Sequence, residues 1–304
     1  MIRIGPSGWS YPDWEGPVYP RSKPRAYHPL DLLATLVDYV EVNSSFYAVP
    51  RAQNSSNWVA RVAHQKSFRF GAKLLQDFTH KPIPEDLARW EELAVEWRRG
   101  IAPLEEKGLL SAVLVQFPVT FQPNDDSVAR LGHIARLFDG LPLVLEVRHR
   151  EWFEPPSLTT IGGLGYSLAH IDLPPSWNHP PASHAAVGPV GYVRLHGRNS
   201  EQWFRSGAGR NDCYDYLYSP PELGEIAHRI DAVAKASDET LVATNNHFEG
   251  QALANALELR WLMGGREPVA ASAELVRAFP HLADITRVMG QRDLYGPASG
   301  RNPA

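Results

Sequence analysis

The amino-acid sequence predicts an α/β protein that folds as a single (β/α)8 TIM barrel with long βα loops. Short apolar or β-branched runs alternate with stretches of helical periodicity, which is typical of parallel βαβ units. There are eight such runs, the number that a barrel requires. The loops that follow the runs are long, whereas the returns into the next run are short and contain glycine, as at Gly140 and Gly162.

The predicted strands are the apolar runs at residues 2–8, 39–43, 68–73, 113–117, 143–148, 166–171, 191–196 and 241–245. The predicted helices lie at residues 30–38, 55–63, 85–99, 127–138, 157–162, 221–236 and 251–263. The link at residues 172–189 has no helical pattern. We expect one barrel domain over residues 1–289 and a flexible tail over 290–304, which is rich in Gly, Pro, Asn and Ser.

The composition is that of an ordinary globular protein. Of 304 residues, 43% are apolar and 21% are charged, which excludes a disordered or collagen-like chain. The net charge of −4 argues against a bulk polycation that binds nucleic acid or acidic lipid non-specifically. The single cysteine, Cys213, cannot form an internal disulfide.

The sequence favours a cytoplasmic protein without a membrane partner. Residues 1–5 show no charged and apolar signal-peptide pattern. The longest apolar stretches reach only about a dozen residues, which is too short to cross a bilayer.

Polar residues follow the carboxyl ends of the predicted strands. Glu41 and Asn43 share one face of their strand, because successive side chains alternate, and Arg194 and His196 do the same. In a parallel barrel these ends meet at one rim, so we expect a candidate site there. Its other members at or beside strand ends are Ser7, Lys73, Gln116, Glu146, Arg148, Asp172, Asn245 and Asn246.

Seven segments spread over residues 1–265 together resemble the DUF72 (YecE-like) family. The resemblance implies a TIM barrel and carries little information about activity, because the family is defined by an unknown function. Ser45 stands where the family pattern leads us to expect threonine, and it keeps the hydroxyl group. The segments are Gly8-Trp9-Ser10-Tyr11-Pro12-Asp13-Trp14, Glu41-Val42-Asn43-Ser44-Ser45-Phe46-Tyr47, Phe78-Thr79-His80, Gln116-Phe117-Pro118, Glu146-Val147-Arg148-His149-Arg150-Glu151-Trp152, Val193-Arg194-Leu195-His196-Gly197-Arg198 and Asn245-Asn246.

The two best-placed acids are Glu41 and Glu146. Paired carboxylates can hydrolyse glycosides. However, Arg148 lies on the same strand face as Glu146 and would hold it ionised, which makes it a poor general acid. A structural ion pair with Arg148 or Arg194 is the alternative interpretation.

Cations concentrate at the same rim and favour an anionic ligand. They are Lys73, Arg148, Arg194 and His196, with His80, His149 and Arg198 on the adjoining loops. Barrels often bind phosphate after their last two strands. Gly197, Gly207 and Gly209 could supply N–H groups there, and Asn245-Asn246 could cap the next helix, although these glycines could equally serve loop turns.

We expect no cofactor, and a divalent metal ion is the alternative. His80, His149, His170, His196 and His247 lie near strand ends, close to Glu41, Glu146 and Asp172. The sequence nevertheless lacks the usual histidine metal-binding spacings, and nearby guanidinium groups would disfavour a cation.

Aromatic residues concentrate in the loops after the strands. They could stack on a sugar or a base while cations hold a phosphate, or they could pack the loops onto the barrel. The segment at residues 203–218 could act as a lid. The rings are those of Trp9, Tyr11, Trp14, Tyr19, Phe46, Tyr47, Trp152, Trp177, Trp203, Phe204, Tyr214, Tyr216 and Tyr218.

Our first hypothesis is an enzyme that acts by acid/base chemistry on an anionic substrate, namely a phosphate-bearing sugar or a nucleotide. Glu41 or His196 would transfer protons, and Lys73 could form a Schiff base. The alternatives are a metal-dependent, endonuclease-like phosphodiesterase and a non-catalytic protein that binds a nucleotide or nucleic acid. The hypothesis names Glu41, His196, Glu146 and Lys73 as catalytic, and Ser7, Trp9, Tyr11, Asn43, Tyr47, His80, Gln116, Arg148, His149, Trp152, Asp172, Arg194, Arg198, Asn245 and Asn246 as substrate-binding. The class of reaction and the oligomeric state stay open.

Overall fold

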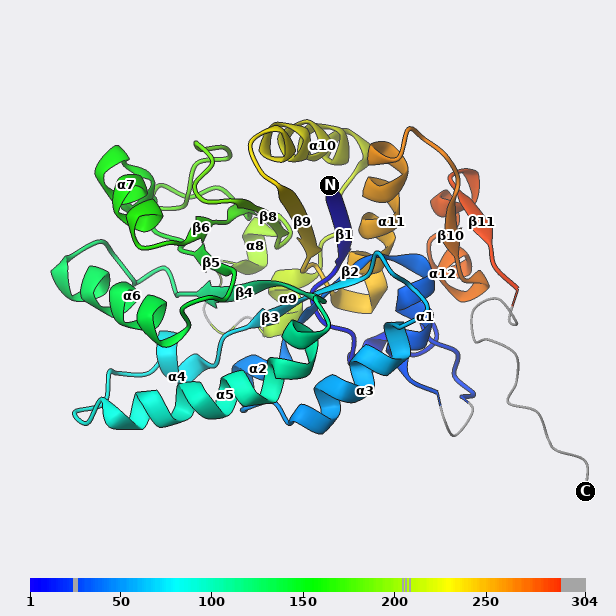
Figure 1. Cartoon of the computed structure of the whole chain (residues 1–304). Coiled ribbons are helices and arrows are strands. Elements are labelled where there is room, and N and C mark those ends of the chain that lie inside the picture. Colours follow the sequence, from blue (N-terminus) through cyan, green and yellow to red (C-terminus); the bar gives the residue numbers. More distant parts are fainter. Residues whose placement is uncertain (24–26, 204, 206, 208, 291–304) are drawn as a thin grey trace, which may run out of the picture.

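The computed structural model describes residues 1–23, 27–203, 205, 207 and 209–290. The described strands form a closed parallel (β/α)8 barrel, which confirms the predicted fold class (Figure 1). Except for Gly290, the tail predicted at residues 290–304 lies outside the described residues. The barrel strands are β1 (Ile2–Pro6), β2 (Tyr39–Val42), β3 (Arg69–Lys73), β4 (Leu110–Gln116), β5 (Leu143–Glu146), β6 (Ser167–Leu168), β7 (His170–Asp172), β8 (Val190–Leu195) and β9 (Glu239–Thr244).

Two parallel sheets close into the barrel. Their strand orders are β1-β9-β8-β7 and β2-β3-β4-β5-β6. A parallel bridge between Ser7 and Glu41 joins β1 to β2, and Gly8 N donates to Glu41 O at 2.9 Å. On the other side β6 pairs with β5 and β7 pairs with β8. Only Ala169 separates β6 from β7, so the single strand predicted at residues 166–171 fills one barrel position in two pieces.

Seven longer helices cover the outside of the strands (Figure 1). Helix α5 extends to Glu106, beyond the predicted end at residue 99, because Ile101 and Leu104 continue its buried face across Pro103. In the described part of the chain, no helix has the length and apolar character needed to cross a bilayer. These helices are α1 (Pro29–Leu36), α3 (Ala52–Val62), α5 (Ala88–Glu106), α6 (Asp125–Leu137), α7 (Pro155–Gly163), α10 (Pro220–Lys235) and α11 (Gln251–Met263).

Several βα loops contain short helices that the sequence pattern did not predict. The link between β7 and β8, at residues 173–189, contains none, as expected. The short helices are η1 (Pro12–Trp14), α2 (Ser44–Tyr47), α4 (Gln76–Thr79), η2 (Arg150–Phe153), α8 (Ser200–Trp203), α9 (Arg210–Tyr214) and η3 (Phe248–Gly250). After α11 come β10 (Val269–Ala271), α12 (Ala273–Ala278), η4 (Pro280–Asp284) and β11 (Thr286–Val288), and β10 pairs in parallel with β11.

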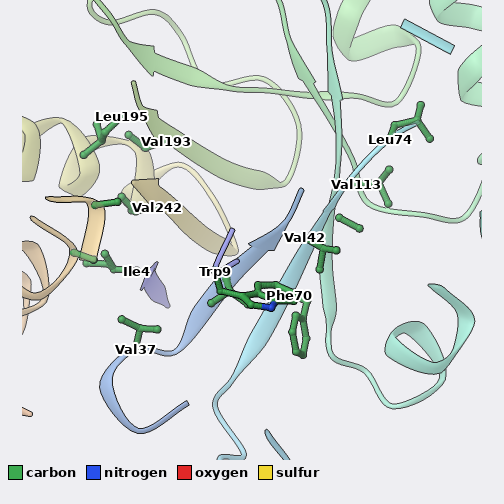
Figure 2. Close-up of a cluster of buried hydrophobic side chains, with 14 of the residues drawn as sticks. Ile4, Trp9, Val37, Val42, Phe70, Leu74, Val113, Val193, Leu195 and Val242 are labelled. Carbon is green, nitrogen blue, oxygen red and sulfur yellow. The ribbon is translucent and has the colours of Figure 1, made fainter. Parts of the chain in front are cut away.

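The apolar core has two parts because strand residues alternate between the inside and the outside of the barrel. The outer part fills the space between strands and helices. Figure 2 shows strand residues of this part, among them Ile4, Val42, Val113 and Val242. The inner part fills the barrel and consists of Tyr39, Ala112, Leu114, Val144, Ala169, Ile171, Tyr192, Leu241 and Ala243.

Candidate active site at the mouth of the barrel

The lining of the barrel changes from apolar to polar toward the carboxyl ends of the strands. Leu114 is followed on the same strand face by Gln116, and Val144 is followed by Glu146. This alternation brings the candidate residues of separate strands into one polar layer above the apolar core. Hydrogen bonds that cross the barrel, mainly from Arg194 on β8, connect most of this layer, which contains Ser7, Glu41, Lys73, Gln116, Glu146, Arg194 and His196.

Arg194 is the centre of the layer. Its guanidinium donates to Glu41 at 2.6 and 3.0 Å and to Glu146 at 2.7 Å. It also donates to Gln116 Oε1 at 3.3 Å and to Ser7 Oγ at 3.2 Å. Each guanidinium nitrogen therefore has a protein acceptor, and the two carboxylates hold the side chain in place.

Both oxygens of the buried Glu41 carboxylate accept hydrogen bonds. Oε1 accepts from Arg194 and from Ser7 Oγ, and Oε2 accepts from Arg194 and from Tyr192 OH at 2.6 Å. Burial raises the pKa of Glu41, but the charge of Arg194 and these hydrogen bonds outweigh burial and leave the pKa below its ordinary value. Glu41 is therefore a carboxylate at neutral pH.

Glu146 lies between two arginines. Its Oε2 accepts from Arg194, and its Oε1 accepts from Arg148 Nε and Nη2 at 3.1 and 2.9 Å. Burial raises the pKa of Glu146, but Arg194, His196 and Arg148 together lower it well below its ordinary value. Glu146 is therefore also ionised, as expected from the Arg148 spacing.

His196 is fully buried beside Glu146. Asn245 Nδ2 lies 3.0 Å from His196 Nδ1, and His196 Nε2 lies 3.3 Å from Glu146 Oε1. Because the asparagine NH2 group donates, we assign the imidazole proton to Nε2. Burial lowers the pKa of His196 to about 4, although Glu146 opposes the shift, so the ring is neutral near pH 7.

Lys73 differs from the other cations of the mouth. Within the described residues no carboxylate lies within salt-bridge distance of its amine, and Nζ lies 3.9 Å from the centre of the Phe46 ring. Burial, and then the charge of Arg194, lower the pKa of Lys73 to about 7. Charged and neutral amine are therefore both populated at neutral pH.

Two adjoining cavities open over this layer, and both are lined by Asn43 and Tyr47. The smaller, of about 80 Å³, is lined by polar groups that include Lys73 and Gln116. Since Gln116 presents its amide oxygen to Arg194, its amide NH2 group is directed elsewhere and can donate to a ligand. The larger cavity, of about 270 Å³, is an aromatic groove lined by Gly8, Trp9, Ser10, Tyr11, Asn43, Ser44, Tyr47 and Trp58.

His80 and two arginines, Arg148 and Arg130, lie on the same side of the mouth as Lys73. The His80 ring lies 5.0 Å from Phe46, and burial, Lys73, Arg148 and Arg130 lower its pKa to about 4. Arg130 donates to the backbone oxygens of Phe78 and Lys81. Lys73, Arg148 and Arg130 therefore give this side of the mouth a positive potential.

Other candidate residues lie apart from the two cavities. Asp172 accepts hydrogen bonds from Arg198 at 2.7 and 2.8 Å and from Tyr218 OH at 2.8 Å, so it joins loops to the barrel. Trp152 is fully buried, stacks on Phe121 and donates to its backbone oxygen at 2.7 Å. Neither these residues nor the buried His149 and Asn246 line the two cavities.

The expected phosphate corner after the last two strands differs from the prediction. Gly197 N donates to Tyr218 OH, and Gly209 N donates to Asp212, so these two N–H groups already have acceptors. Asn245 and Asn246 do not cap α11, because η3 intervenes and Gly250 is the N-cap. Asn246 instead donates to Tyr216 O and Asn255 Oδ1, both at 2.8 Å.

The predicted lid segment lies over His196 where the structure describes it. The rings of Trp203 and Tyr214 each lie 6.2 Å from the His196 ring, and Arg148 lies 5.9 Å from the Trp203 ring. Phe204, together with residues 206 and 208, lies outside the described part of the chain.

The donor groups do not gather around a metal position in the described ranges. No group of three or more His, Cys, Asp or Glu side chains there is arranged to hold a metal ion. The guanidinium of Arg194 occupies the space between Glu41 and Glu146, where a cation bound by both carboxylates would lie.

The sequence pattern did not indicate several residues that contact the polar layer or line its cavities. The hydroxyl groups of Tyr39 and Tyr192 are hydrogen-bonded to each other, with 2.7 Å between their oxygens. Tyr192 OH in turn donates to Glu41. Their strand positions offered a signal, because Tyr39 shares a face with Glu41, and Tyr192 with Arg194. Trp58 comes from the middle of α3, where the sequence pattern gave no indication of a site.

Comparison with known proteins identifies the family. Residues 3–277 match the family model "Protein of unknown function DUF72". The UPF0759 protein YunF of Bacillus subtilis (strain 168) is 29% identical over 275 residues, which are 86% of this chain and 95% of that protein.

Two solved structures have the same fold. A DUF72 family protein of Enterococcus faecalis V583 has a TM-score of 0.76 and 26% identity, and the match covers 87% of this chain and 96% of that one. A DUF72 family protein of Thermotoga maritima MSB8 has a TM-score of 0.73 and 27% identity, and the match covers 87% of this chain and 99% of that one. The resemblance predicted from the sequence motifs is therefore confirmed, and this chain belongs to the DUF72 family.

Proposed function

We propose that this protein is an enzyme that acts on a small anionic molecule, a phosphate-bearing sugar or a nucleotide, at the mouth of the barrel. The anionic group would occupy the polar cavity beside Lys73, and the ring of the substrate would occupy the aromatic groove. The observation that carries the proposal is the position of the Lys73 amine, which lines the polar cavity without a carboxylate partner in the described residues.

The charges around the cavity support an anionic ligand. Arg194 pairs with both Glu41 and Glu146, and Arg148 also pairs with Glu146, so two guanidinium charges balance the two carboxylates. Among the described residues, Lys73 then has no carboxylate within salt-bridge distance. An oxyanion in the cavity could accept hydrogen bonds from the Lys73 amine and the Gln116 amide.

The protonation states favour Lys73 for proton transfer. A general acid or base works best when its pKa is near the working pH. The pKa of Lys73 is about 7, whereas burial lowers the pKa of His196 to about 4. Glu41 and Glu146 are ionised and hydrogen-bonded to Arg194. We therefore assign these two residues and the neutral His196 to holding the other side chains of the mouth in place.

The adjoining groove supports a substrate that contains a ring. Trp9 and Trp58 pack edge to face at 5.5 Å, and Tyr11 and Tyr47 contribute further rings. Aromatic side chains of this kind stack on sugars and on bases. The shared lining residues Asn43 and Tyr47 would lie between the ring and the anionic group.

A ligand screen followed by a turnover assay tests the proposal. Sugar phosphates, nucleotides and the matching uncharged sugars and nucleosides are added to the protein, and the melting temperature is measured. Compounds that stabilise the protein are then incubated with it and examined for conversion by NMR. We expect phosphorylated compounds alone to stabilise the protein, and at least one of them to be converted.

The variant Lys73→Met should lose the stabilisation and the conversion, whereas the exposed control Lys66→Met should retain both. Stabilisation by uncharged sugars alone, or equal behaviour of the two variants, would overturn the proposal. Binding without conversion of any bound compound would favour the non-catalytic binding protein instead.

The same lysine also permits covalent chemistry with a carbonyl substrate. A neutral amine can attack a carbonyl carbon and lose water to form a Schiff base. Borohydride reduction during turnover, followed by mass spectrometry, distinguishes the two roles. A stable adduct on Lys73 indicates the Schiff base, and its absence during active turnover indicates proton transfer.

A further inference from the structure

The outside of the barrel has an unusual covering between β7 and β8. In a regular barrel the crossover between two parallel strands contains a helix that packs on them. Here residues 173–189 form an irregular link. The link is held to α10 by a hydrogen bond from Arg229 to Ala182 O at 2.9 Å, and the ring centres of His184 and Phe153 lie 4.9 Å apart.

A cavity of about 360 Å³ lies beneath this link, against β7, β8 and α10. Its size is typical of a small-molecule site. Most of its walls are aliphatic, with Val193 from β8, Ala182 and Ala186 from the link, and Ala232 and Val233 from the helix. These walls favour an apolar molecule over water.

One wall is flat and uncharged. The rings of His170 and His184 stack in parallel, with 3.8 Å between their centres and 3° between their planes. Burial, and then His184 and Arg229, lower the pKa of His170 to about 3, and burial lowers that of His184. Both imidazoles are therefore neutral at physiological pH and do not prevent an apolar group from binding beside them.

The cavity also has one fixed positive charge, the guanidinium of Arg229. This group donates to Asp172 Oδ2, but the same carboxylate also accepts two hydrogen bonds from Arg198. Two arginines therefore share Asp172, and Arg198 also pairs with Glu222 at 3.3 Å. Arg229 Nη1 donates to Ala182 O and Nη2 donates to Asp172 Oδ2, and the side chain is 24% exposed, so its remaining N–H groups can donate to an additional anionic partner.

We infer that this cavity binds an apolar carboxylic acid, with the hydrocarbon part against the aliphatic walls and the carboxylate on Arg229. The site is separate from the mouth of the barrel, because its lining shares no residue with the two mouth cavities. The apolar walls, the cavity size and the single cation together define this ligand class.

Calorimetric titration with octanoate and with 1-octanol tests the inference. Ala232→Trp places an indole against the cavity, and Arg229→Met removes the charge while keeping a long side chain. Ala60→Trp on the exposed surface of α3 and Arg277→Met on the exposed surface of α12 are the matched controls. Circular dichroism verifies that each variant is folded.

We expect saturable octanoate binding to the unmodified protein and to both controls, and at least a tenfold weaker binding to Ala232→Trp. Arg229→Met should weaken octanoate binding tenfold or more and leave octanol binding unchanged. Absence of octanoate binding, or equal binding by Ala232→Trp and Ala60→Trp, would refute the site. Equal octanoate binding by Arg229→Met would refute its preference for an acid.

Discussion

Lys73 and Arg194 lie in the same mouth, yet their surroundings shift their pKa values in opposite directions. Arg194 lies between two carboxylates, which raise its pKa well above the ordinary value despite burial. Lys73 faces the Phe46 ring, and burial is the main cause of its lowered pKa. Arg194 is thus a permanent structural charge, whereas Lys73 can gain or lose a proton during a reaction.

The first prediction concerns the stability of the Lys73→Met variant. The ordinary pKa of lysine is 10.5 and that of folded Lys73 is about 7, so between these values the unfolded chain binds a proton that the folded chain lacks. The stability of the unmodified protein should therefore rise with pH across this window. At pH 7 the variant should be more stable by about 2–4 kcal/mol.

Urea denaturation at pH 7 and at pH 9.5 measures this difference. We expect the advantage of Lys73→Met to be largest at pH 7 and to shrink at pH 9.5. A variant that is less stable at pH 7, or an advantage that does not change with pH, contradicts the low pKa of Lys73.

The second prediction concerns the arginine that joins the carboxylates. Arg194→Met leaves Glu41 and Glu146 buried without their shared partner, which should cost about 3–5 kcal/mol of unfolding free energy. The control is Arg61→Met, which removes a partly exposed pair with Asp31 and should cost at most about 1 kcal/mol. Denaturant titration compares the two variants, and equal losses would show that Arg194 does not hold the layer together.

At the scale of the elements, glycine allows β1 to approach β2 where the barrel closes. A Cβ atom on Gly5 would lie 1.7 Å from the backbone oxygen of Tyr39, a distance that only movement of the backbone can relieve. The third prediction is therefore that Gly5→Ala destabilises the protein by about 2 kcal/mol or more.

The matched control is Gly224→Ala in the interior of α10, where nothing lies within 4 Å of the added methyl group. This change should stabilise the protein by about 0.5–1 kcal/mol, because alanine loses less backbone entropy in a helix. Thermal denaturation measures both effects. A neutral Gly5→Ala variant would mean that the strands are less tightly packed than described.

Periodicity predicted the barrel strands and the seven longer helices because it reflects one buried face at a time, but it did not predict β10, α12 or β11 after residue 263. The strand pattern also placed Glu41 and Arg194 correctly on the interior side of their strands. The periodic pattern could not predict features that depend on tertiary contacts. The split at Ala169 arises because β6 and β7 pair with different neighbours, and Asn246 binds Tyr216 O across a loop rather than a helix end. The short helices of the βα loops have too few residues for a periodic signal.

At the scale of the whole molecule, barrel closure brings together residues from distant parts of the chain. Ser7 and Glu41 meet across the closing strands, and Arg194 bonds to both. The chain carries a net charge of −4, but the side of the mouth around Lys73 carries Arg148 and Arg130. This local excess of positive charge attracts an anion that the molecule as a whole would repel.

The central claim is that Lys73 binds the anionic group of a ligand in its protonated form. It is tested most directly by measuring the dissociation constant of sulfate between pH 6 and pH 9, since sulfate does not itself titrate there. Above a pKa of about 7 the protonated fraction of Lys73 falls, so the affinity for sulfate should fall about tenfold per pH unit. Lys73→Met should bind sulfate weakly at every pH, and Lys66→Met should behave like the unmodified protein. An affinity that is independent of pH, or unchanged in Lys73→Met, would contradict the account.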